Sequence, residues 1–251
     1  MVLPVLTHSY LTLPKMTYYE AILHLKTESN KGLAILIDPE DFERETAAEF
    51  LRKLPKETTH IFVGGSTASH EATKATVLEI KNFTSKPVLL FPGDYSQLTN
   101  EADAVLFLSL LSGRNVEYLI GQQLKSVSLL QSSSLEIIPT GYILVDGGNV
   151  SAVELVSNTK PLAQLNEKAI VETALAGQYM GAKLIYLEAG SGARVPVHGD
   201  IISKVKKAIN VPLIVGGGIR TEEQKQLAYD AGADMVVMGT VFEENLKVAG
   251  L

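Results

Sequence analysis

The chain has 251 residues, of which 46% are hydrophobic, and a formal net charge of −6. This length is typical of one (β/α)8 barrel of about 250 residues, and the negative charge argues against a nucleic-acid-binding surface. The sequence contains no cysteine, no secretory signal pattern and no apolar run of the about 20 residues that span a membrane. We therefore expect a cytoplasmic protein without disulfides or thiolate metal sites, whose contact with a membrane surface is at most peripheral.

Short β-rich runs alternate with helical stretches, which is typical of a parallel sheet. The predicted strands occupy residues 32–37, 60–63, 87–91, 104–108, 136–145, 182–188, 211–215 and 234–238. The predicted helices occupy residues 18–27, 42–54, 71–82, 116–126, 166–180, 201–209 and 222–231. No linker rich in Pro, Gly or Ser divides this series. The pattern therefore predicts a single (β/α)8 TIM-type barrel domain over residues 1–251.

The alternation breaks after the third predicted strand. Residues 92–103 (PGDYSQLTNEAD) carry Pro, Gly, Asp and Asn without apolar periodicity, and they are few for a connection that includes a helix. We expect the third helix to be missing or reduced to a turn. Its absence would leave an apolar flank that either forms a groove for a long apolar ligand or is covered by a packed surface loop.

The last three predicted strands each end in a glycine-rich turn. These turns are residues 189–192 (AGSG), 216–219 (GGGI) and 239–240 (GT). Glycine lets backbone N–H groups approach an anion closely, and the final loops of a (β/α)8 barrel commonly form a phosphate site with a helix N-terminus. Three such turns in series predict a phosphate site.

Polar side chains at other strand ends suggest the chemistry. Asp38 and Ser66 end adjacent strands, and their oxygens suit Mg²⁺, although Asp38 is equally explained as a helix N-cap. Glu188 lies beside the phosphate loops, where a general base or hydroxyl anchor is its natural role and a solvated charge is the alternative. Tyr186 shares its side of the strand, as a ligand contact or as a core aromatic residue.

Four further charged residues remain open as candidates. Arg194 and Arg220 follow glycine-rich turns and could pair with phosphate, while Asp94 and Asp146 end strands. The five histidines are scattered without metal-ligand spacing and receive no role. Neither a P-loop lysine motif nor a G-x-S-x-G nucleophile elbow is present.

Several segments together resemble the geranylgeranylglyceryl phosphate synthase family. They are residues 186–192 (YLEAGSG), 215–220 (VGGGIR), 239–240 (GT), 37–39 (IDP) and 63–66 (VGGS). The resemblance covers nearly the whole chain and implies Mg²⁺-dependent transfer of a prenyl group, most often geranylgeranyl, from a prenyl diphosphate to the 3-hydroxyl of sn-glycerol 1-phosphate, in ether phospholipid synthesis. It also implies a barrel without its third helix.

The resemblance further implies roles for individual residues. Asp38 and Ser66 would hold Mg²⁺, and Glu188 and Asp38 would be catalytic. The glycerol phosphate would bind to Tyr186, Leu187, Glu188, Ala189, Gly190, Ser191, Gly192, Gly217, Gly218, Gly239 and Thr240. Some members carry a lysine where this chain has Leu36, so the chain resembles the branch without that contact.

Two other function classes share part of this pattern. Another phosphate-binding barrel, such as a sugar-phosphate isomerase or a lyase, would use the glycine turns around a compact polar pocket. A non-catalytic barrel would keep only the scaffold. We also expect a homo-oligomer, because the apolar flank requires a cover and a symmetric dimer is the commonest closure; the resemblance adds that dimers and hexamers both occur.

Overall fold

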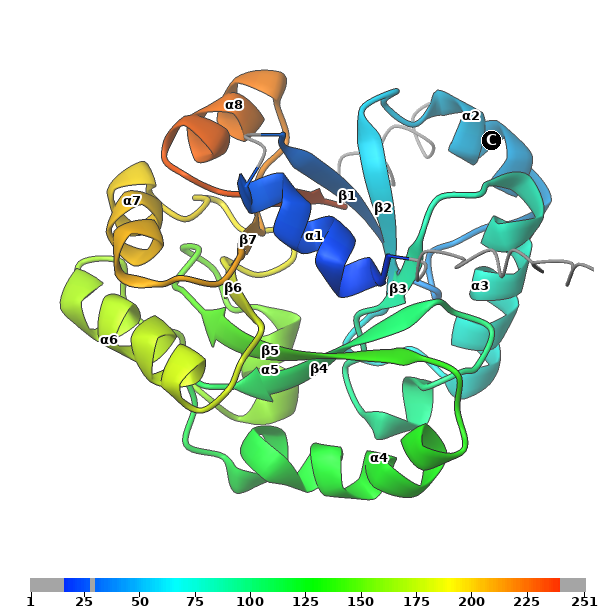
Figure 1. Cartoon of the computed structure of the whole chain (residues 1–251), viewed down its shortest axis with the longest axis horizontal. Coiled ribbons are helices and arrows are strands. Elements are labelled where there is room, and N and C mark those ends of the chain that lie inside the picture. The colour runs from blue at the N-terminus through cyan, green and yellow to red at the C-terminus, as the bar shows by residue number, and fades with distance from the viewer. Residues whose placement is uncertain (1–15, 28–29, 240–251) are drawn as a thin grey trace, which may run out of the picture.

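A computed structural model of the chain describes residues 16–27 and 30–239. Eight parallel strands close into a barrel in the order β1-β2-β3-β4-β5-β6-β7-β8, with helices around it (Figure 1). The strands are β1 (Gly32–Ile37), β2 (Thr58–Val63), β3 (Val88–Leu90), β4 (Ala104–Leu110), β5 (Glu136–Leu144), β6 (Leu184–Glu188), β7 (Leu213–Gly216) and β8 (Met235–Met238). The predicted (β/α)8 barrel is confirmed.

The helices lie largely where the sequence predicts them. They are α1 (Tyr18–Thr27), α2 (Ala47–Lys53), α3 (His70–Phe83), α4 (Gln122–Gln131), α5 (Ala152–Ser157), α6 (Glu167–Tyr179), α7 (Gly199–Ala208) and α8 (Glu222–Asp230). In the described residues they are accompanied by three short helical turns: η1 (Arg44–Thr46), η2 (Tyr95–Gln97) and η3 (Glu117–Gly121), the last a π-helix.

The core has two layers because successive side chains of a strand point to opposite faces. The inner layer fills the barrel and includes Ala34, Phe62 and Tyr186. The outer layer includes Ile35 and Val63 and packs against the surrounding helices. Both faces of each strand are therefore buried, which explains the unbroken apolar runs.

Helix α1 crosses the N-terminal end of the barrel, as Figure 1 shows in its centre, and its fully buried Ile22 joins the inner layer. Thr17 and Glu20 cap the helix start through reciprocal backbone–side-chain hydrogen bonds of 2.7 and 3.1 Å. The Glu136 carboxylate at the start of β5 accepts two more, from Tyr18 N–H (2.6 Å) and Tyr19 N–H (3.0 Å). This end of the barrel is therefore closed, and the opposite end is open for a site.

Between β3 and β4 the structure has only the single turn η2, so the expected reduction of the third helix is confirmed. The Asp94 carboxylate starts this turn by accepting hydrogen bonds from Ser96 N–H (2.7 Å) and Ser96 Oγ (2.6 Å). A short polar side chain that satisfies the local backbone in this way favours a turn over a continuing helix.

Two other segments differ from the sequence prediction. The predicted helix 42–54 begins later, because Glu43 is extended and η1 precedes α2. The segment predicted as a polar linker before residue 162 contains α5, which Ser151 caps by accepting from Glu154 N–H and which Asn158 ends in the left-handed region (φ 48°). At six residues, α5 is too short to show helical periodicity in the sequence.

Candidate active site

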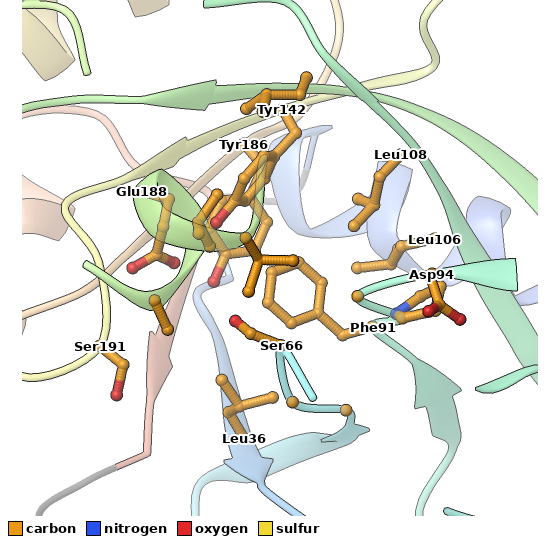
Figure 2. A pocket seen from close by; sticks show the side chains of 18 of the residues that line it. Leu36, Ser66, Phe91, Asp94, Leu106, Leu108, Tyr142, Tyr186, Glu188 and Ser191 are labelled. Carbon is orange, nitrogen blue, oxygen red and sulfur yellow. The ribbon is translucent and has the colours of Figure 1, made fainter. Parts of the chain in front are cut away.

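A cavity of about 310 Å³ lies at the C-terminal end of the strands. Figure 2 shows Glu188 and Ser191 on one side of it, Asp94, Leu106 and Leu108 on the other, and Ser66 and Phe91 between them. The cavity therefore joins a polar end, beside the glycine-rich turns, to an apolar arm.

Glu188 is a buried carboxylate at the polar end. Its side chain accepts a hydrogen bond of 2.7 Å from Gly190 N–H, and the residue is only 6% exposed. Burial raises the pKa of Glu188 to about 7, while the Gly190 hydrogen bond and the nearby Tyr186 hydroxyl offset part of the rise. A carboxylate poised near neutral pH suits a general base.

An aromatic cluster lies under Glu188. The Tyr186 ring is stacked on Phe91 with centroids 5.2 Å apart, and Tyr142 packs against both at 5.5 and 5.7 Å. The Tyr186 hydroxyl is buried and makes no hydrogen bond of normal geometry. Tyr186 is thus both a core aromatic residue and part of the cavity wall, which unites the two alternatives from the sequence.

The glycine turns bring backbone close to Glu188. Gly217 and Gly218 have φ of +83° and +73°, a conformation that favours glycine. A Cβ on Gly217 would lie 2.3 Å from Glu188 Oε1 and 2.7 Å from both Ala189 N and Gly190 N. The turn after β7 therefore packs directly on the turn after β6, so that glycine is required at residue 217.

Arg220 joins the same two turns. Its Nη1 donates to the Ala193 carbonyl at 2.8 Å, and the residue lines the cavity. Among the described residues that line the cavity, Arg220 is the only arginine or lysine, whereas four carboxylates (Asp38, Asp41, Asp94 and Glu188) share the wall. Arg194 and Asp146 do not line it.

Asp38 and Ser66 line the cavity at the ends of β1 and β2. Asp38 Oδ1 accepts from Glu40 N–H at 3.0 Å, but it does not cap α2, whose N-cap is Thr46, so the capping alternative is wrong. Burial raises the pKa of Asp38, and the charges of Asp41 and Glu40 add to the rise. No cluster of three or more His, Cys, Asp or Glu that could hold a metal occurs in the described part of the chain.

The apolar arm, lined by β4, η2, η3, α4 and α5, follows from the reduced third helix. Its walls include Leu98, Phe107, Leu108, Tyr118, Val153 and Val156. Phe107 points to the outer layer of β4, where a full helix would cover it in a complete barrel. A second hollow of about 250 Å³ shares Leu98 and lies between α3 and α4. The groove alternative for the apolar flank is therefore the one that the structure supports.

The structure brings most of the predicted site residues together. The cavity wall contains Asp38, Ser66, Tyr186, Glu188, Ser191, Gly217, Gly218 and Gly239. The Leu187 and Ala189 side chains belong to the outer layer and point away from the cavity, so these residues can contact a ligand only through backbone atoms. Gly190 and Gly192 belong to the turn after β6, with φ of +97° and +70°. Thr240 lies outside the described residues.

Sequence reasoning missed the individual residues of the apolar arm. The short segment before β4 signalled a groove, but Tyr118, Val153 and Val156 come from elements distant in sequence. Val153 and Val156 belong to α5, which the sequence did not reveal.

Comparison with known proteins agrees with this geometry. A family model described as "PcrB family" matches residues 26–249. The chain belongs to the PcrB family. A member from Zunongwangia profunda named geranylgeranylglyceryl phosphate synthase is 55% identical over 224 residues, covering 89% of this chain and 96% of that protein. A Flavobacterium johnsoniae protein of the same name is 46% identical over 230 residues, covering 91% and 95%.

A solved structure of a similar protein has the same fold. The (S)-3-O-geranylgeranylglyceryl phosphate synthase of Thermoplasma acidophilum, crystallised with sn-glycerol-1-phosphate, superposes with a TM-score of 0.83 at 36% identity. The match covers 91% of this chain and 92% of that one. No helix in the described residues of this chain is long and apolar enough to cross a membrane.

Proposed function

We propose that this PcrB-family protein is a geranylgeranylglyceryl phosphate synthase. It transfers a prenyl group from a prenyl diphosphate to the 3-hydroxyl of sn-glycerol 1-phosphate and releases diphosphate, as a step of ether phospholipid synthesis. The observation that carries the proposal is the cavity that joins glycine turns and a buried glutamate to an apolar arm. The names of its relatives, which are 40–55% identical, support the same reaction.

Glu188 is the proposed general base. The glycerol 3-hydroxyl oxygen attacks C1 of the prenyl group, the bond between C1 and the diphosphate oxygen breaks, and Glu188 takes the hydroxyl proton. A carboxylate with a pKa of about 7 accepts that proton at neutral pH. Its negative charge also favours the positive charge that develops on the allylic carbon.

The glycine turns are the proposed binding site of the glycerol phosphate. Backbone N–H groups of the turns after β6, β7 and β8 hold the phosphate, with the predicted set from Tyr186 to Gly192, Gly217, Gly218, Gly239 and Thr240 around the substrate. Arg220 adds the positive charge that balances the anion, in a chain that has Leu36 in place of the lysine of other members. A guanidinium pairs with phosphate through two parallel N–H donors.

Asp38 and Ser66 are the proposed Mg²⁺ ligands, and their chemistry fits that ion. Both supply oxygen to the cavity, and the described residues contain no all-protein carboxylate cage. Mg²⁺ usually takes one or two carboxylates and completes its shell with water and substrate phosphates. When bound, Mg²⁺ supplies charge neutralisation for the departing diphosphate.

The apolar arm and the buried glutamate each argue against one of the two alternatives. A sugar-phosphate isomerase or a lyase needs a compact polar pocket, whereas Phe107, Tyr118 and Val156 extend the cavity away from the glycine turns. A non-catalytic barrel has no use for a buried glutamate with a raised pKa, whose burial is energetically unfavourable.

We also propose that the protein assembles as a symmetric homodimer, or as a hexamer built from three such dimers. Four apolar residues are 44–67% exposed and follow helical spacing along η3 and α4: Val116, Ile120, Leu124 and Val127. An apolar stripe of this kind is typical of an interface. The alternative is that the stripe makes peripheral contact with a membrane, which would receive the lipid product. The absence of cysteine agrees with a cytoplasmic location of the protein.

A direct assay tests the proposed reaction. The purified protein is incubated with Mg²⁺, sn-glycerol 1-phosphate and prenyl diphosphates of increasing length, and products are detected by mass spectrometry. We expect the prenyl ether of glycerol phosphate, most abundant with geranylgeranyl diphosphate. Product from glycerol 3-phosphate alone, or no product with any prenyl donor, would contradict the proposal.

A further inference from the structure

A buried glutamine stands where the third helix is reduced to a turn. Gln97, the last residue of η2, is 1% exposed, and both ends of its amide are used. Its Oε1 accepts from Gly93 N–H at 2.9 Å, and its Nε2 donates to the Gly65 carbonyl at 2.8 Å. One side chain thus joins the loop after β3 to the loop after β2.

The loop after β2 packs closely against Asp38, and the loop after β3 packs closely against the loop after β2. A Cβ on Gly65 would lie 2.3–2.5 Å from the Asp38 carboxylate, and a Cβ on Gly93 would lie 2.7 Å from the Gly65 carbonyl oxygen and 3.1 Å from Ser66 Cα. Asp38, Gly65 and Gly93 therefore form successive close contacts. A shift of Gly65 moves the surface on which the Asp38 carboxylate rests.

Gln97 itself does not line the cavity, whereas Asp38, Gly65, Ser66 and Gly93 do. It therefore cannot act on substrate directly. The side chain fixes the distance between the β2 and β3 loops, and through Gly65 it fixes the placement of Asp38 relative to Ser66.

We infer that Gln97 is a positioning residue for the diphosphate end of the site. This inference rests on the proposed function, because it requires that Asp38 and Ser66 receive Mg²⁺ and a prenyl diphosphate. Residues that orient the ligands of a metal typically change metal affinity or activity by about 10–100-fold when replaced. The turn η2, which replaces the third helix, therefore has two roles. Its shortness opens the apolar arm, and its last residue is Gln97.

A second glutamine provides a matched comparison on the other side of the barrel mouth. Gln164 Nε2 donates to the carbonyls of Asp146 (2.9 Å) and Pro196 (3.1 Å), and its Oε1 accepts from His198 N–H (2.9 Å). It ties the loop after β5 to the segment between β6 and α7, away from Asp38, and it does not line the cavity.

The test compares Gln97→Met and Gln164→Met, which keep the approximate length of the side chain and remove its hydrogen bonds. Isothermal titration measures two affinities for each protein: a non-hydrolysable prenyl thiolodiphosphate with Mg²⁺, and sn-glycerol 1-phosphate alone. We expect Gln97→Met to weaken the first by about 10-fold or more and to leave the second within about 2-fold. Gln164→Met should not reproduce this selectivity.

Gln97→Glu provides a second variant if Gln97→Met does not fold. It keeps the acceptor for Gly93 N–H and loses the donor to the Gly65 carbonyl, so we expect the same selective loss. Equal loss of both affinities, or loss of neither, in a folded Gln97 variant would overturn the inference alone. A parent protein that binds neither the analogue nor inorganic diphosphate with Mg²⁺ would overturn the proposed function, and the inference with it.

Discussion

Burial of Glu188 lowers the stability of the folded state and gives the residue a pKa that suits its proposed chemistry. Its carboxylate is buried beside an aromatic cluster with one backbone donor, Gly190, which is too little to hold its pKa at that of an exposed glutamate. The resulting pKa of about 7 lies at the working pH of a general base. The carboxylate is therefore unfavourable for the folded state, and its pKa suits the general-base role that we propose for it.

Replacing Glu188 by Gln should lower turnover by about 10²–10⁴, because the isosteric amide cannot accept the glycerol hydroxyl proton. In the parent, kcat/KM should rise with pH up to about 7, where the carboxyl ionises, and then level off. Steady-state assays from pH 5 to pH 9 check both outcomes. A variant as fast as the parent would remove Glu188 from catalysis.

The same variant should be more stable than the parent at high pH. Because the pKa of Glu188 is raised from 4.5 to about 7, the folded state retains the proton longer than the unfolded chain. Stability from this group is therefore full below pH 4.5 and is lost as pH rises through about 7. Glu188→Gln should gain about 1–3 kcal/mol over the parent at pH 8 and little at pH 4.5, measured by urea unfolding. An equal gain at both pH values would contradict this account.

Asp38 supports a different prediction at this scale. Asp38→Asn should abolish Mg²⁺-dependent turnover while the fold remains intact, because it removes the carboxylate proposed to hold the ion. The pKa of Asp38 is raised, so the folded state does not favour its charge, and asparagine can still accept from Glu40 N–H. Thermal unfolding serves as the control. Full activity with an unchanged Mg²⁺ requirement would contradict the metal role.

Among the elements, η2 and α4 shape part of the apolar arm of the cavity. With the third helix reduced to η2, the outward-facing Phe107 of β4 becomes a wall of the apolar arm. Helix α4 forms another part of that wall through Ser126, which is 4% exposed and small. The side chains of α4 are therefore one determinant of the length of the arm.

Enlarging Ser126 should shorten the apolar arm. Ser126→Leu should lower kcat/KM for a 20-carbon prenyl diphosphate by about 10-fold relative to a 10-carbon one, since steric loss in an apolar pocket has roughly this effect. Competition assays with both donors measure the ratio. Ser128→Leu, on the exposed side of α4, is the control that should leave the ratio unchanged. A uniform loss at both lengths would contradict the assignment.

Some elements could be predicted from the sequence and others could not, for physical reasons. The apolar strand at residues 32–37 and the helixless segment at 92–103 carry local signals, namely unbroken apolarity and turn residues. The polar end of the site was predictable because Asp38, Ser66 and Glu188 sit at strand ends, which meet at one edge of a barrel. A groove was one of two alternatives from the sequence, but the residues of the apolar arm could not be predicted, because its walls depend on how η2, α4 and α5 pack after folding.

At the scale of the whole molecule, the apolar stripe on η3 and α4 determines the expected assembly. The described part of the chain leaves Val116, Ile120, Leu124 and Val127 exposed on one side of these helices. The same helices form part of the wall of the apolar arm, so an assembly through the stripe would lie beside the cavity.

The particle should have at least twice the 27.1 kDa monomer mass in light scattering with inline chromatography. Leu124→Glu should reduce the mass to that of the monomer, because a buried unpaired charge in an interface is strongly unfavourable. Leu227→Glu is the control, since Leu227 is 60% exposed on the distant α8. A monomeric parent would contradict the dimer, and loss of vesicle binding by Leu124→Glu would then point to the membrane as the cover.

The backbone hydrogen bonds that α1 donates to the Glu136 carboxylate can form only after Glu136 has been synthesised. The two partners are 117 and 118 positions apart, and Glu136 is the later one to be synthesised. At about 5–20 residues per second on the ribosome, the glutamate follows the helix by roughly 6–24 s. During that interval α1 has neither this cap nor a finished barrel in which to bury Ile22. Helix α1 is therefore synthesised early and docks late.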